Sequence, residues 1–575
     1  MARLGERRSG PAREVDGIDV LDRLASAPLW AHASALLVAL FVLLPVVGTS
    51  ASYSADEGAA IIQARSLADG DGWIIPHPVP EVDPTGKLYP LELSLAGPKG
   101  AASYGKHPAY PVVLAAADRL GGVTAMVSVS LLATWVAALA AAALATRVAG
   151  GLARTALWVA GLGSPLLFNG YWVIAHTLGA AAIAWAVVAV VDGSRPGRRA
   201  WVLAAAPLLV AIATLLRTEA ALYGIGLALV AAGWGIGTRR PLLVVTGAAT
   251  GIAVAAARAI DSVVARRIVG EPLLSRSAFD PRPAASFLSE RLDGLTATWL
   301  RPAPPGDSSL AGVLVLVAAV LVLVAAVCAL RARPGPAVVL AGGAAVLLAV
   351  PAIALPAIPV PGLLFAFPIL VVGAIGALGH PVVVDRRSTT IVLGTLLVGW
   401  AGVLATQYAE GGVTEWGGRY FAVGLPLTVP LVLVGVRALL VDLPPASARG
   451  ITVALGVILL ALSAVSLREL REVHEDTRDT FALIDATADR VGPRPVVVTD
   501  VAAAPRLDWA NFDDHRWLLV DPDAEADLPA ALADAGIERW VLVSGDVDHA
   551  LEAFDDLTVV EQASPSVVVV ERRRP

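Results

Sequence analysis

Several ionisable side chains stand beside apolar runs, at places that are widely separated in this sequence. Two carboxylates are adjacent at Asp56 and Glu57, and a basic pair follows at Lys106 and His107. The other groups placed in this way are His176, Arg217, Glu219, Glu410, Glu415 and Arg419. A carboxylate can remove the proton of an attacking hydroxyl, whereas guanidinium and ammonium groups pair with phosphate through charge-assisted hydrogen bonds. Together these residue types suit an anionic substrate and a reaction that needs a base.

The elements that must hold these groups are membrane helices. The 575 residues are 56% hydrophobic and only 16% charged, and the mean hydropathy is +0.71. A helix of about 20 apolar residues crosses the hydrocarbon core of a bilayer, and such runs recur to give about 13 spans. Helices also satisfy their own backbone polar groups in lipid. We therefore predict a polytopic α-helical membrane protein and exclude a soluble globular class.

The apolar runs predict the spans, and the arginines predict their orientation. Spans are expected at 29–49, 122–146, 155–170, 173–191, 200–216, 220–237, 241–259, 309–330, 335–355, 359–379, 389–407, 421–441 and 450–467. The N-terminal segment 1–28 carries several arginines, including Arg3 and Arg23, and is expected to be cytoplasmic. Alternating the spans then places the loop with Arg195, Arg198 and Arg199 inside and the C-terminus outside.

Three segments are long enough to carry function outside the membrane. The transmembrane domain, 29–467, includes a first outer loop at 50–121 and a second at 260–308. Within the first loop, 56–68 and 108–120 have the pattern of short amphipathic helices that lie at the interface. The third segment, 468–575, alternates β-rich runs such as "RPVVVTD" and "RWVLVSG" with the helical pattern "DLPAALADAGI". It is predicted to be a small α/β domain.

With this threading, the ionisable groups of the opening paragraph all fall at the outer ends of helices. Charged residues near membrane depth are costly and are functional candidates by default. Their gathering on one face therefore predicts a single site there. No nucleotide-binding motif of the type G-x-x-x-x-G-K-[ST] occurs, so an enzyme with this site needs an activated donor that is embedded in the membrane.

The order of five motifs resembles a known superfamily. They are "SADEGAAIIQARSLADGDG", "SYGKHPAYPVVLAAADRLGG", "SPLLFNGYWVIAHTLGAAAIAWAVV", "AIATLLRTEAALYGIGLAL" and "GGVTEWGGRYFAVGLPL". Over about residues 28–440 the chain is similar to the GT-C superfamily of polyprenyl-phosphate-sugar-dependent glycosyltransferases. These enzymes include protein O-mannosyltransferases, the lipid A aminoarabinose transferase and the mycobacterial arabinosyl- and mannosyltransferases.

The resemblance implies an inverting transferase with a GT-C-like fold and an acidic general base directly after the first span. By position the base is Asp56, and Glu57 supports it or shares the role. The substrate-binding residues that it implies, together with those suggested by the one-sided cluster, are Lys106, His107, His176, Arg217, Glu219, Arg419 and Tyr420. Lys106 and His107 match the loop that approaches the donor phosphate. Relatives often carry an acid where this chain has His176.

The expected partners are a polyprenyl-phosphate-linked sugar, membrane lipids and an extracytoplasmic glycan, lipid or protein acceptor, with no nucleic acid. The expected location is a bacterial plasma membrane, with the site and the α/β domain on its outer face. The single cysteine, Cys328, excludes a disulfide within the chain. No histidine spacing indicates a metal, although an acidic site can bind a hard divalent cation through oxygens. A divalent cation therefore stays open as a cofactor.

Structural interpretations stand beside these functional ones. Asp56 and Glu57 can stabilise a helix N-terminus, Arg217 and Glu219 can form a structural ion pair, and Arg419 can extend along the interface. Two other functions also fit a polytopic protein. One is a transporter or flippase for a lipid-linked sugar, which normally has midplane charges and internal repeats. The other is a non-catalytic envelope scaffold that binds a partner through 468–575.

Overall fold

The structure is a computed structural model whose described residues are 26–91, 95–97, 100–195, 201–270, 284–300, 309–354, 362–379, 385–406, 416–554 and 556–573. Most of the predicted cytoplasmic segment 1–28 lies outside these ranges, as do Glu410 and Glu415. All the other site candidates from the sequence fall within them.

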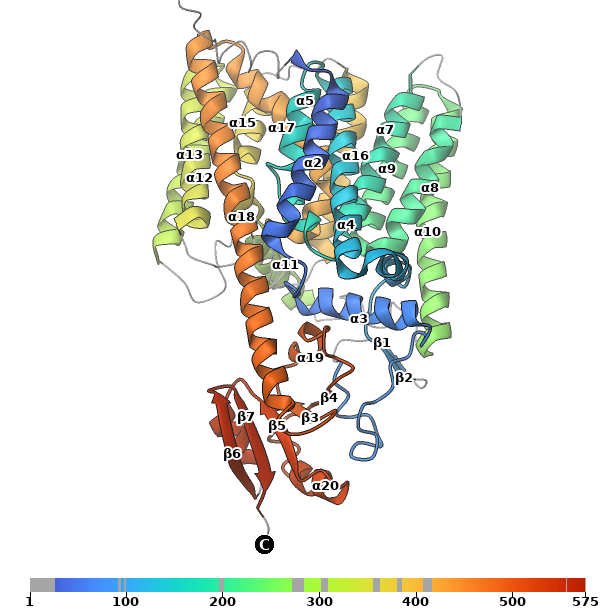
Figure 1. The fold of residues 1–575 in the computed structure, drawn as a ribbon. Coiled ribbons are helices and arrows are strands. Elements are labelled where there is room, and N and C mark those ends of the chain that lie inside the picture. The colour runs from blue at the N-terminus through green and yellow to red at the C-terminus, as the bar shows by residue number, and fades with distance from the viewer. Residues whose placement is uncertain are drawn as a thin grey trace, which may run out of the picture.

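A bundle of helices forms the larger part of the protein (Figure 1). Its helices are α2 (Leu29–Val47), α4 (Ala109–Val148), α5 (Ala153–Gly161), α6 (Leu166–Gly170), α7 (His176–Gly193), α8 (Trp201–Leu216), α9 (Thr218–Gly237), α10 (Pro241–Val269), α11 (Ala284–Leu300), α12 (Ser309–Leu330), α13 (Pro334–Ala354), α14 (Leu363–Ala366), α15 (Ile369–Gly379), α16 (Arg386–Thr406), α17 (Leu425–Leu440) and α18 (Pro445–Ala488). Among the described residues, 10 helices are long and apolar enough to cross a membrane, and α8 and α15 are shorter apolar helices. The chain is therefore a multi-pass membrane protein, as predicted.

Several of the predicted spans differ from the helices that form. The run 359–379 is divided, because α14 ends at Ala366 and α15 begins at Ile369. The run 155–170 is divided, because α5 ends at Gly161 and α6 begins at Leu166. Pro165 precedes α6, and a proline has no backbone N–H to continue a helix. The last run, 450–467, is only the first half of α18, which continues to Ala488. Pairs four residues apart, such as Arg471 with Glu475 at 2.8 Å, support the helix beyond the apolar part.

Helix α3 (Ala55–Asp69) lies across one end of the bundle, which we call the site end (Figure 1). It begins after the N-cap Ser54, and Gly70 ends it in the left-handed conformation at φ 93°. The first part of α4 is a separate helical segment, because the backbone leaves helical geometry at Gly121 and Gly122. These two segments confirm the helices predicted at 56–68 and 108–120.

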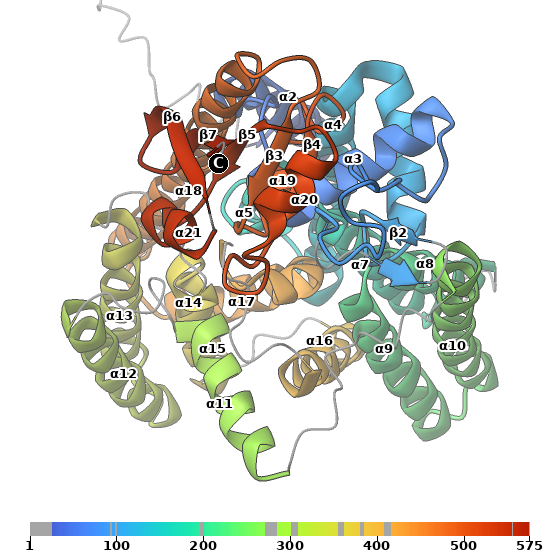
Figure 2. The same cartoon turned by 90° about the horizontal axis from the view of Figure 1, so that it is seen from below.

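A five-stranded sheet follows α18; it lies below the site end in Figure 1 and in front of the bundle in Figure 2, which is seen from below. Its strands are β3 (Val496–Thr499), β4 (Arg516–Leu519), β5 (Arg539–Val543), β6 (Leu557–Ser564) and β7 (Val567–Arg572), in the order β4-β3-β5-β7-β6. The first three are parallel, and β7 and β6 are antiparallel to their neighbours. The helices that accompany them are α19 (Ala504–Leu507), α20 (Leu528–Asp534) and α21 (Val547–Ala553). This confirms a small C-terminal sheet domain, and every β-rich run named from the sequence is a strand.

The sheet domain and the first outer loop share one hydrophobic core. Val79 and Leu88 of that loop are buried with the apolar side chains of the sheet. The N–H of Leu519 on β4 donates to the carbonyl of Leu88 at 3.1 Å, and Arg516 pairs with Glu81 at 3.2 Å. The loop thus covers the edge of the sheet, which would otherwise present unpaired backbone groups. The same loop also holds the antiparallel pair β1 (Leu95–Gly97) and β2 (Gly100–Ala102).

The sheet domain also contacts α3 directly through α19 and the residues after it. A Cβ atom at Gly58 would lie 1.8 Å from the carbonyl oxygen of Arg506, so only glycine allows this approach. Further along α3, the guanidinium of Arg65 lies 4.5 Å from the ring centroid of Trp509 and donates to its carbonyl at 3.2 Å. The helix that begins with Asp56 is therefore held between the bundle and the sheet domain.

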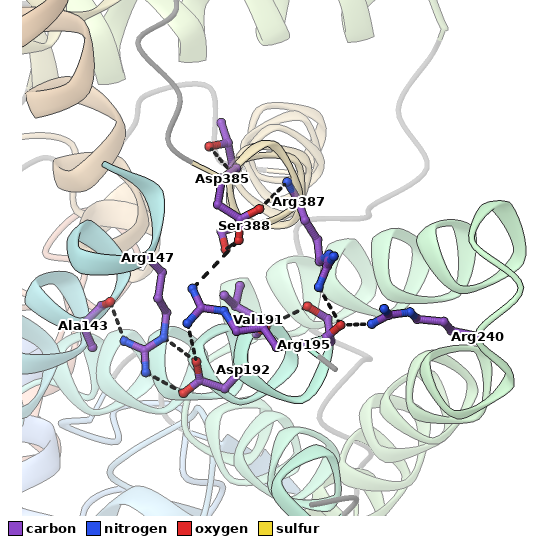
Figure 3. Close-up of polar contacts among 11 residues, drawn as sticks. Ala143, Arg147, Val191, Asp192, Arg195, Arg240, Asp385, Arg387 and Ser388 are labelled. Atoms are coloured by element: carbon purple, nitrogen blue, oxygen red, sulfur yellow. Dashed lines mark hydrogen bonds and ion pairs between the residues drawn. The ribbon is translucent and has the colours of Figure 1, made fainter. Parts of the chain in front are cut away.

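The opposite end of the bundle is joined by a separate charged network (Figure 3). Arg147 of α4 pairs with Asp192 of α7 through two hydrogen bonds of 2.6 and 2.5 Å. The carbonyl of Ser194 accepts hydrogen bonds from Arg240 and from Arg387, the latter at 2.8 Å. These contacts fix the spacing of α4, α7, α10 and α16 at the end farthest from His176, where α7 begins. All of these arginines have protein partners, so we assign the network a structural role.

We expect Gly58→Ala to lower the melting temperature and to make the sheet domain easier to cleave by trypsin. Forcing a methyl group into a filled space costs about 1–3 kcal/mol. Gly450→Ala is the matched control, since a Cβ atom there meets no described atom within 4 Å. Thermal unfolding and limited proteolysis of the full chain in detergent would measure both effects. Equal melting temperatures for Gly58→Ala and wild type would contradict the close contact.

Candidate active site

Asp56 lies in the first turn of α3, at the site end of the bundle. Its Oδ2 atom is 2.5 Å from Nζ of Lys106 and 3.4 Å from Nη1 of Arg419. Burial raises the pKa of Asp56, but Lys106 and then Arg419 outweigh it and hold that pKa well below its usual range. The side chain keeps 27% of its surface exposed. Asp56 is therefore an ionised carboxylate that a substrate can reach.

Glu57 has a different environment although it is the next residue. Its Oε2 accepts from the backbone N–H of Tyr53 at 2.7 Å, and its Oε1 accepts from that of Val173 at 2.8 Å. The residue is only 2% exposed, and this burial, opposed by the two amides, raises the pKa of Glu57 to about 7. Glu57 thus ties the start of α3 to the segment between α6 and α7. Its carboxyl is engaged by the backbone, unlike that of Asp56.

Arg419 reaches Asp56 from a distant part of the chain. It begins a short 3-10 helix, η2 (Arg419–Gly424), after Gly418, which has φ 63° and leaves no room for a side chain against the carbonyl of Thr298. The guanidinium lies 5.8 Å from the ring centroid of Trp172 and 5.4 Å from that of Tyr420. Such aromatic faces attract a cation and orient it. The sequence-predicted pair Arg419 and Tyr420 is therefore part of the site.

Arg217 and Glu219 form a buried ion pair where α8 ends and α9 begins. Glu219 accepts two hydrogen bonds from the guanidinium, at 3.0 Å from Nε and 2.6 Å from Nη2. Arg217 is 7% exposed and Glu219 is 8% exposed. Helix α7 lies against Arg217 at Gly179, where a Cβ atom would be 3.4 Å from the arginine Cγ, an ordinary van der Waals distance. The structural and the functional interpretations of this pair are compatible, because Arg217 also acts electrostatically on Asp56.

His107 is held by protein groups on both ring nitrogens. Its Nδ1 lies 2.7 Å from Oδ2 of Asp261 on α10, and its Nε2 lies 3.0 Å from Oγ1 of Thr218 on α9. The ring is 3% exposed. Burial lowers the pKa of His107, and the hydrogen bond to Asp261 opposes this only in part. We therefore take the imidazole to be neutral.

His176 is the site histidine that has no protein partner among the described residues. Both of its ring nitrogens are buried without a hydrogen bond, and the residue is 2% exposed. Its ring is stacked with that of Trp172, at a centroid distance of 6.3 Å and an interplanar angle of 12°. Arg217, Arg419 and Lys106 all act on it electrostatically, so it borders the same cationic cluster. A buried nitrogen without a partner is costly and suits a ligand atom.

The structure adds three residues that the sequence analysis did not single out. Tyr104 is buried and lies within electrostatic range of Asp56, Arg217, Glu219 and Arg419. Asp261 binds His107, and Trp172 lies between His176 and Arg419 and donates from Nε1 to Ser54 at 3.2 Å. Tyr104 and Trp172 stand inside motifs quoted above, so their place in those motifs was a usable signal. Asp261 lies just beyond the predicted end of a span, and nothing in the sequence around it indicates that it binds His107.

A search of the described residues for three or more His, Cys, Asp or Glu side chains that could hold a metal ion finds no such group. The histidines of the site make contacts of other kinds, with a carboxylate, a hydroxyl and an aromatic ring.

Comparison with known proteins adds a likeness in fold. Neither a family model nor a curated protein matches the sequence. Among solved structures, the fold is similar to ArnT from Cupriavidus metallidurans bound to undecaprenyl phosphate, with 16% identity, coverage of 94% of this chain and 97% of that one, and a TM-score of 0.49. It is also similar to the apo state of that ArnT, with 15% identity, coverage of 94% and 98%, and a TM-score of 0.41.

We expect Glu57→Gln to lower thermal stability, because a glutamine amide cannot accept from both backbone N–H groups. Leaving one buried donor unpaired costs about 1–3 kcal/mol. Because the pKa of Glu57 in the folded protein, about 7, is above the usual glutamate value of 4.5, protonation stabilises the folded state. That stabilisation is complete below 4.5 and is lost as pH rises through about 7.

The melting temperature of wild type minus that of Glu57→Gln should therefore be larger at pH 5 than at pH 8. Glu475→Gln, which changes a partly exposed carboxylate on α18, is the control and should show no such change. A difference that grows with pH would show instead that the folded protein prefers ionised Glu57.

Proposed function

We propose that this protein is an integral-membrane glycosyltransferase of the GT-C type. It transfers a sugar from a polyprenyl-phosphate donor to an acceptor hydroxyl, with inversion, and its site end faces the outside of the cell membrane. The observation that carries the proposal is the ionised, accessible Asp56 carboxylate beside Lys106 and Arg419, at the end of a bundle of apolar helices. The motif order of the sequence supports the same class.

The reaction that suits this cluster is a single displacement at the anomeric carbon. The proton of the acceptor hydroxyl passes to the carboxylate of Asp56 as its oxygen forms a bond to that carbon. The bond between the carbon and the phosphate oxygen breaks, and its electron pair leaves with the polyprenyl phosphate. Attack opposite the leaving group inverts the configuration. Negative charge grows on the leaving phosphate, so cations nearby favour this step.

Lys106 and Arg419 are the groups we assign to the donor phosphate. Both already bind an anion, the carboxylate of Asp56, and both are partly exposed, at 39% and 16% of their side chains. Arg217 adds positive charge from deeper in the site, although Glu219 neutralises part of it. A phosphodiester at the end of a lipid is a suitable ligand for such an arrangement.

His176 and Tyr420 are assigned to the substrate side of the same cluster. The two unpartnered nitrogens of His176 can exchange hydrogen bonds with a sugar hydroxyl or a phosphate oxygen. Tyr420 orients Arg419 through its ring. Glu57 has the supporting role that the resemblance allows, because its two bonds to backbone amides fix the start of α3 and so the direction of Asp56.

We expect Asp56→Asn to abolish transfer while the protein still folds and inserts. Loss of a general base lowers kcat by about 10²–10⁴-fold. Asp69→Asn, at the exposed far end of the same helix, is the matched control and should transfer at the wild-type rate. The assay follows transfer of labelled sugar from a polyprenyl-phosphate donor by purified protein in liposomes. Full activity in Asp56→Asn, or equal losses in both variants, would contradict the assignment of the base.

We expect Lys106→Met to move the acidic limb of the pH profile of kcat/KM to higher pH. The ammonium favours the ionised form of Asp56, so its removal raises the pKa of that carboxyl. The donor KM should also rise, by about 10-fold for loss of a charged contact worth about 1.4 kcal/mol. Lys87→Met is the control, since Lys87 is exposed and pairs with Glu525 of the sheet domain. An acidic limb that stays at the wild-type pH would contradict the proposal that Lys106 lowers the pKa of the catalytic Asp56.

A further inference from the structure

His107 is the chain neighbour of Lys106, which we assign to the donor phosphate, yet its ring faces the protein. Both nitrogens are occupied, by Asp261 at 2.7 Å and by Thr218 at 3.0 Å, and the side chain is 4% exposed. A ring with both nitrogens engaged offers no polar atom to a substrate. The role of His107 therefore has to be sought in what its two bonds hold together.

Asp261 is an acid on a predominantly apolar helix, and its position explains how it can be buried there. With a rise of 1.5 Å per residue, it lies about 30 Å along α10 from Pro241, which is about the thickness of the hydrocarbon core. It is 2% exposed, and Nη1 of Arg258, on the same helix, is 3.8 Å from its Oδ2. Such a carboxylate is stable only if it stays paired, and His107 supplies the shortest contact.

The bond from His107 to Thr218 joins the two chain segments that carry the cations. Lys106 is the neighbour of His107 in the chain, and Arg217 is the neighbour of Thr218. Consecutive Cα atoms are about 3.8 Å apart, so fixing His107 against Thr218 limits how far the two cationic residues can separate. Asp261 anchors the ring from a third element, α10, and its shorter, charge-assisted bond is the stronger of the two restraints. Loss of the Thr218 bond alone therefore has the smaller effect.

The carboxylate of Asp261 determines which atom donates and which accepts in the two hydrogen bonds of His107. An ionised Asp261 can only accept, so Nδ1 of a neutral imidazole carries the proton and donates to it. Nε2 is then the acceptor for the hydroxyl of Thr218. One tautomer and one ring orientation therefore satisfy both partners. Carboxylates orient catalytic and metal-bound histidines in other proteins in the same way.

We propose that Asp261 and His107 form a positioning pair that sets the separation of Lys106 and Arg217 for a lipid phosphate. The inference rests on the proposed function, which assigns Lys106 to the donor phosphate and gives Arg217 a supporting positive charge deeper in the site. Asp261 and His107 do not touch the substrate in this account. They act through Lys106 and the start of α9, so their loss weakens donor binding more than it slows the chemical step at Asp56.

The test uses two substitutions of His107 that each keep the reach of one ring nitrogen. In His107→Asn the side-chain amide takes the place of Nδ1 and can still donate to Asp261. In His107→Gln it takes the place of Nε2, so the bond to Asp261 is lost. We expect His107→Gln and Asp261→Asn each to weaken binding of undecaprenyl phosphate about 10-fold, or about 1.4 kcal/mol, and His107→Asn to weaken it by less than about threefold, or 0.65 kcal/mol.

The readouts are binding of undecaprenyl phosphate to the full chain in nanodiscs, and donor KM and kcat in the transfer assay. The donor KM should follow the binding losses while kcat stays within about threefold of wild type, a change of 0.65 kcal/mol in the barrier. The double variant His107→Gln/Asp261→Asn should bind no more weakly than either single variant, since both remove one interaction. Thr218→Ser should restore most of any affinity lost in Thr218→Val. His32→Gln, which by the same geometry loses the bond that Nδ1 accepts from Trp158 away from the site, is the control.

Wild-type affinity in His107→Gln and Asp261→Asn would overturn the positioning pair. Equal losses in His107→Asn and His107→Gln would also overturn it, because they would indicate a general packing defect. Should Asp261→Asn fail to fold, the comparison of the two His107 variants still decides. Failure of the proposed function is a different result, namely wild-type protein that transfers no sugar.

Discussion

The contact between Asp56 and Lys106 is the interaction on which the rest of the site depends. A carboxylate at the edge of an apolar bundle would be costly unless a cation stays beside it. Lys106 lies 2.5 Å from Asp56, and Arg419 adds a second charge on the same oxygen. The pair therefore keeps Asp56 ionised. It also holds positive charge at the place where we propose that the lipid phosphate binds.

Holding that contact requires three distant segments to meet on one short helix. Glu57 fixes the start of α3 against the segment before α7, and Gly58 lets the sheet domain lie directly on it. Lys106 comes from the end of the first outer loop, whose earlier part shares a core with the sheet. Removing the sheet domain would thus disturb both the loop and the helix that carry the site. Such a domain is part of the scaffold of the site, whatever it contributes to acceptor binding.

Much of this arrangement could be predicted because it depends on local sequence pattern. Apolar runs of span length located most of the helices, and short β-branched runs located all five strands of the sheet. The gathering of Asp56, Lys106, Arg217 and Arg419 followed from one rule, that ionisable groups stood at the same ends of successive spans. Segment 155–170 was wrong as a single helix, because hydropathy does not register the break before Pro165.

Other features depend on contacts between segments far apart in the chain, and no local pattern reveals them. Asp56 and Glu57 are neighbours in the first turn, but their side chains point about 100° apart on a helix. Only the position of Val173 decides which of them is engaged by the backbone. Asp261 likewise falls just after a predicted span, in what the sequence predicts to be a loop. No local pattern reveals its partner, because His107 is 154 positions away. The packing of Val79 and Leu88 into the sheet is equally non-local.

The most direct test is a structure of the full-length protein with undecaprenyl phosphate, determined by cryo-electron microscopy in a lipid nanodisc. The account predicts that the phosphate lies at the site end, within hydrogen-bond distance, about 3 Å, of Lys106 and Arg419. Asp56 should stand beside it with its carboxylate accessible to a second substrate. A phosphate bound at the opposite end, among the arginines around Ser194 in Figure 3, would contradict the assignment of the site.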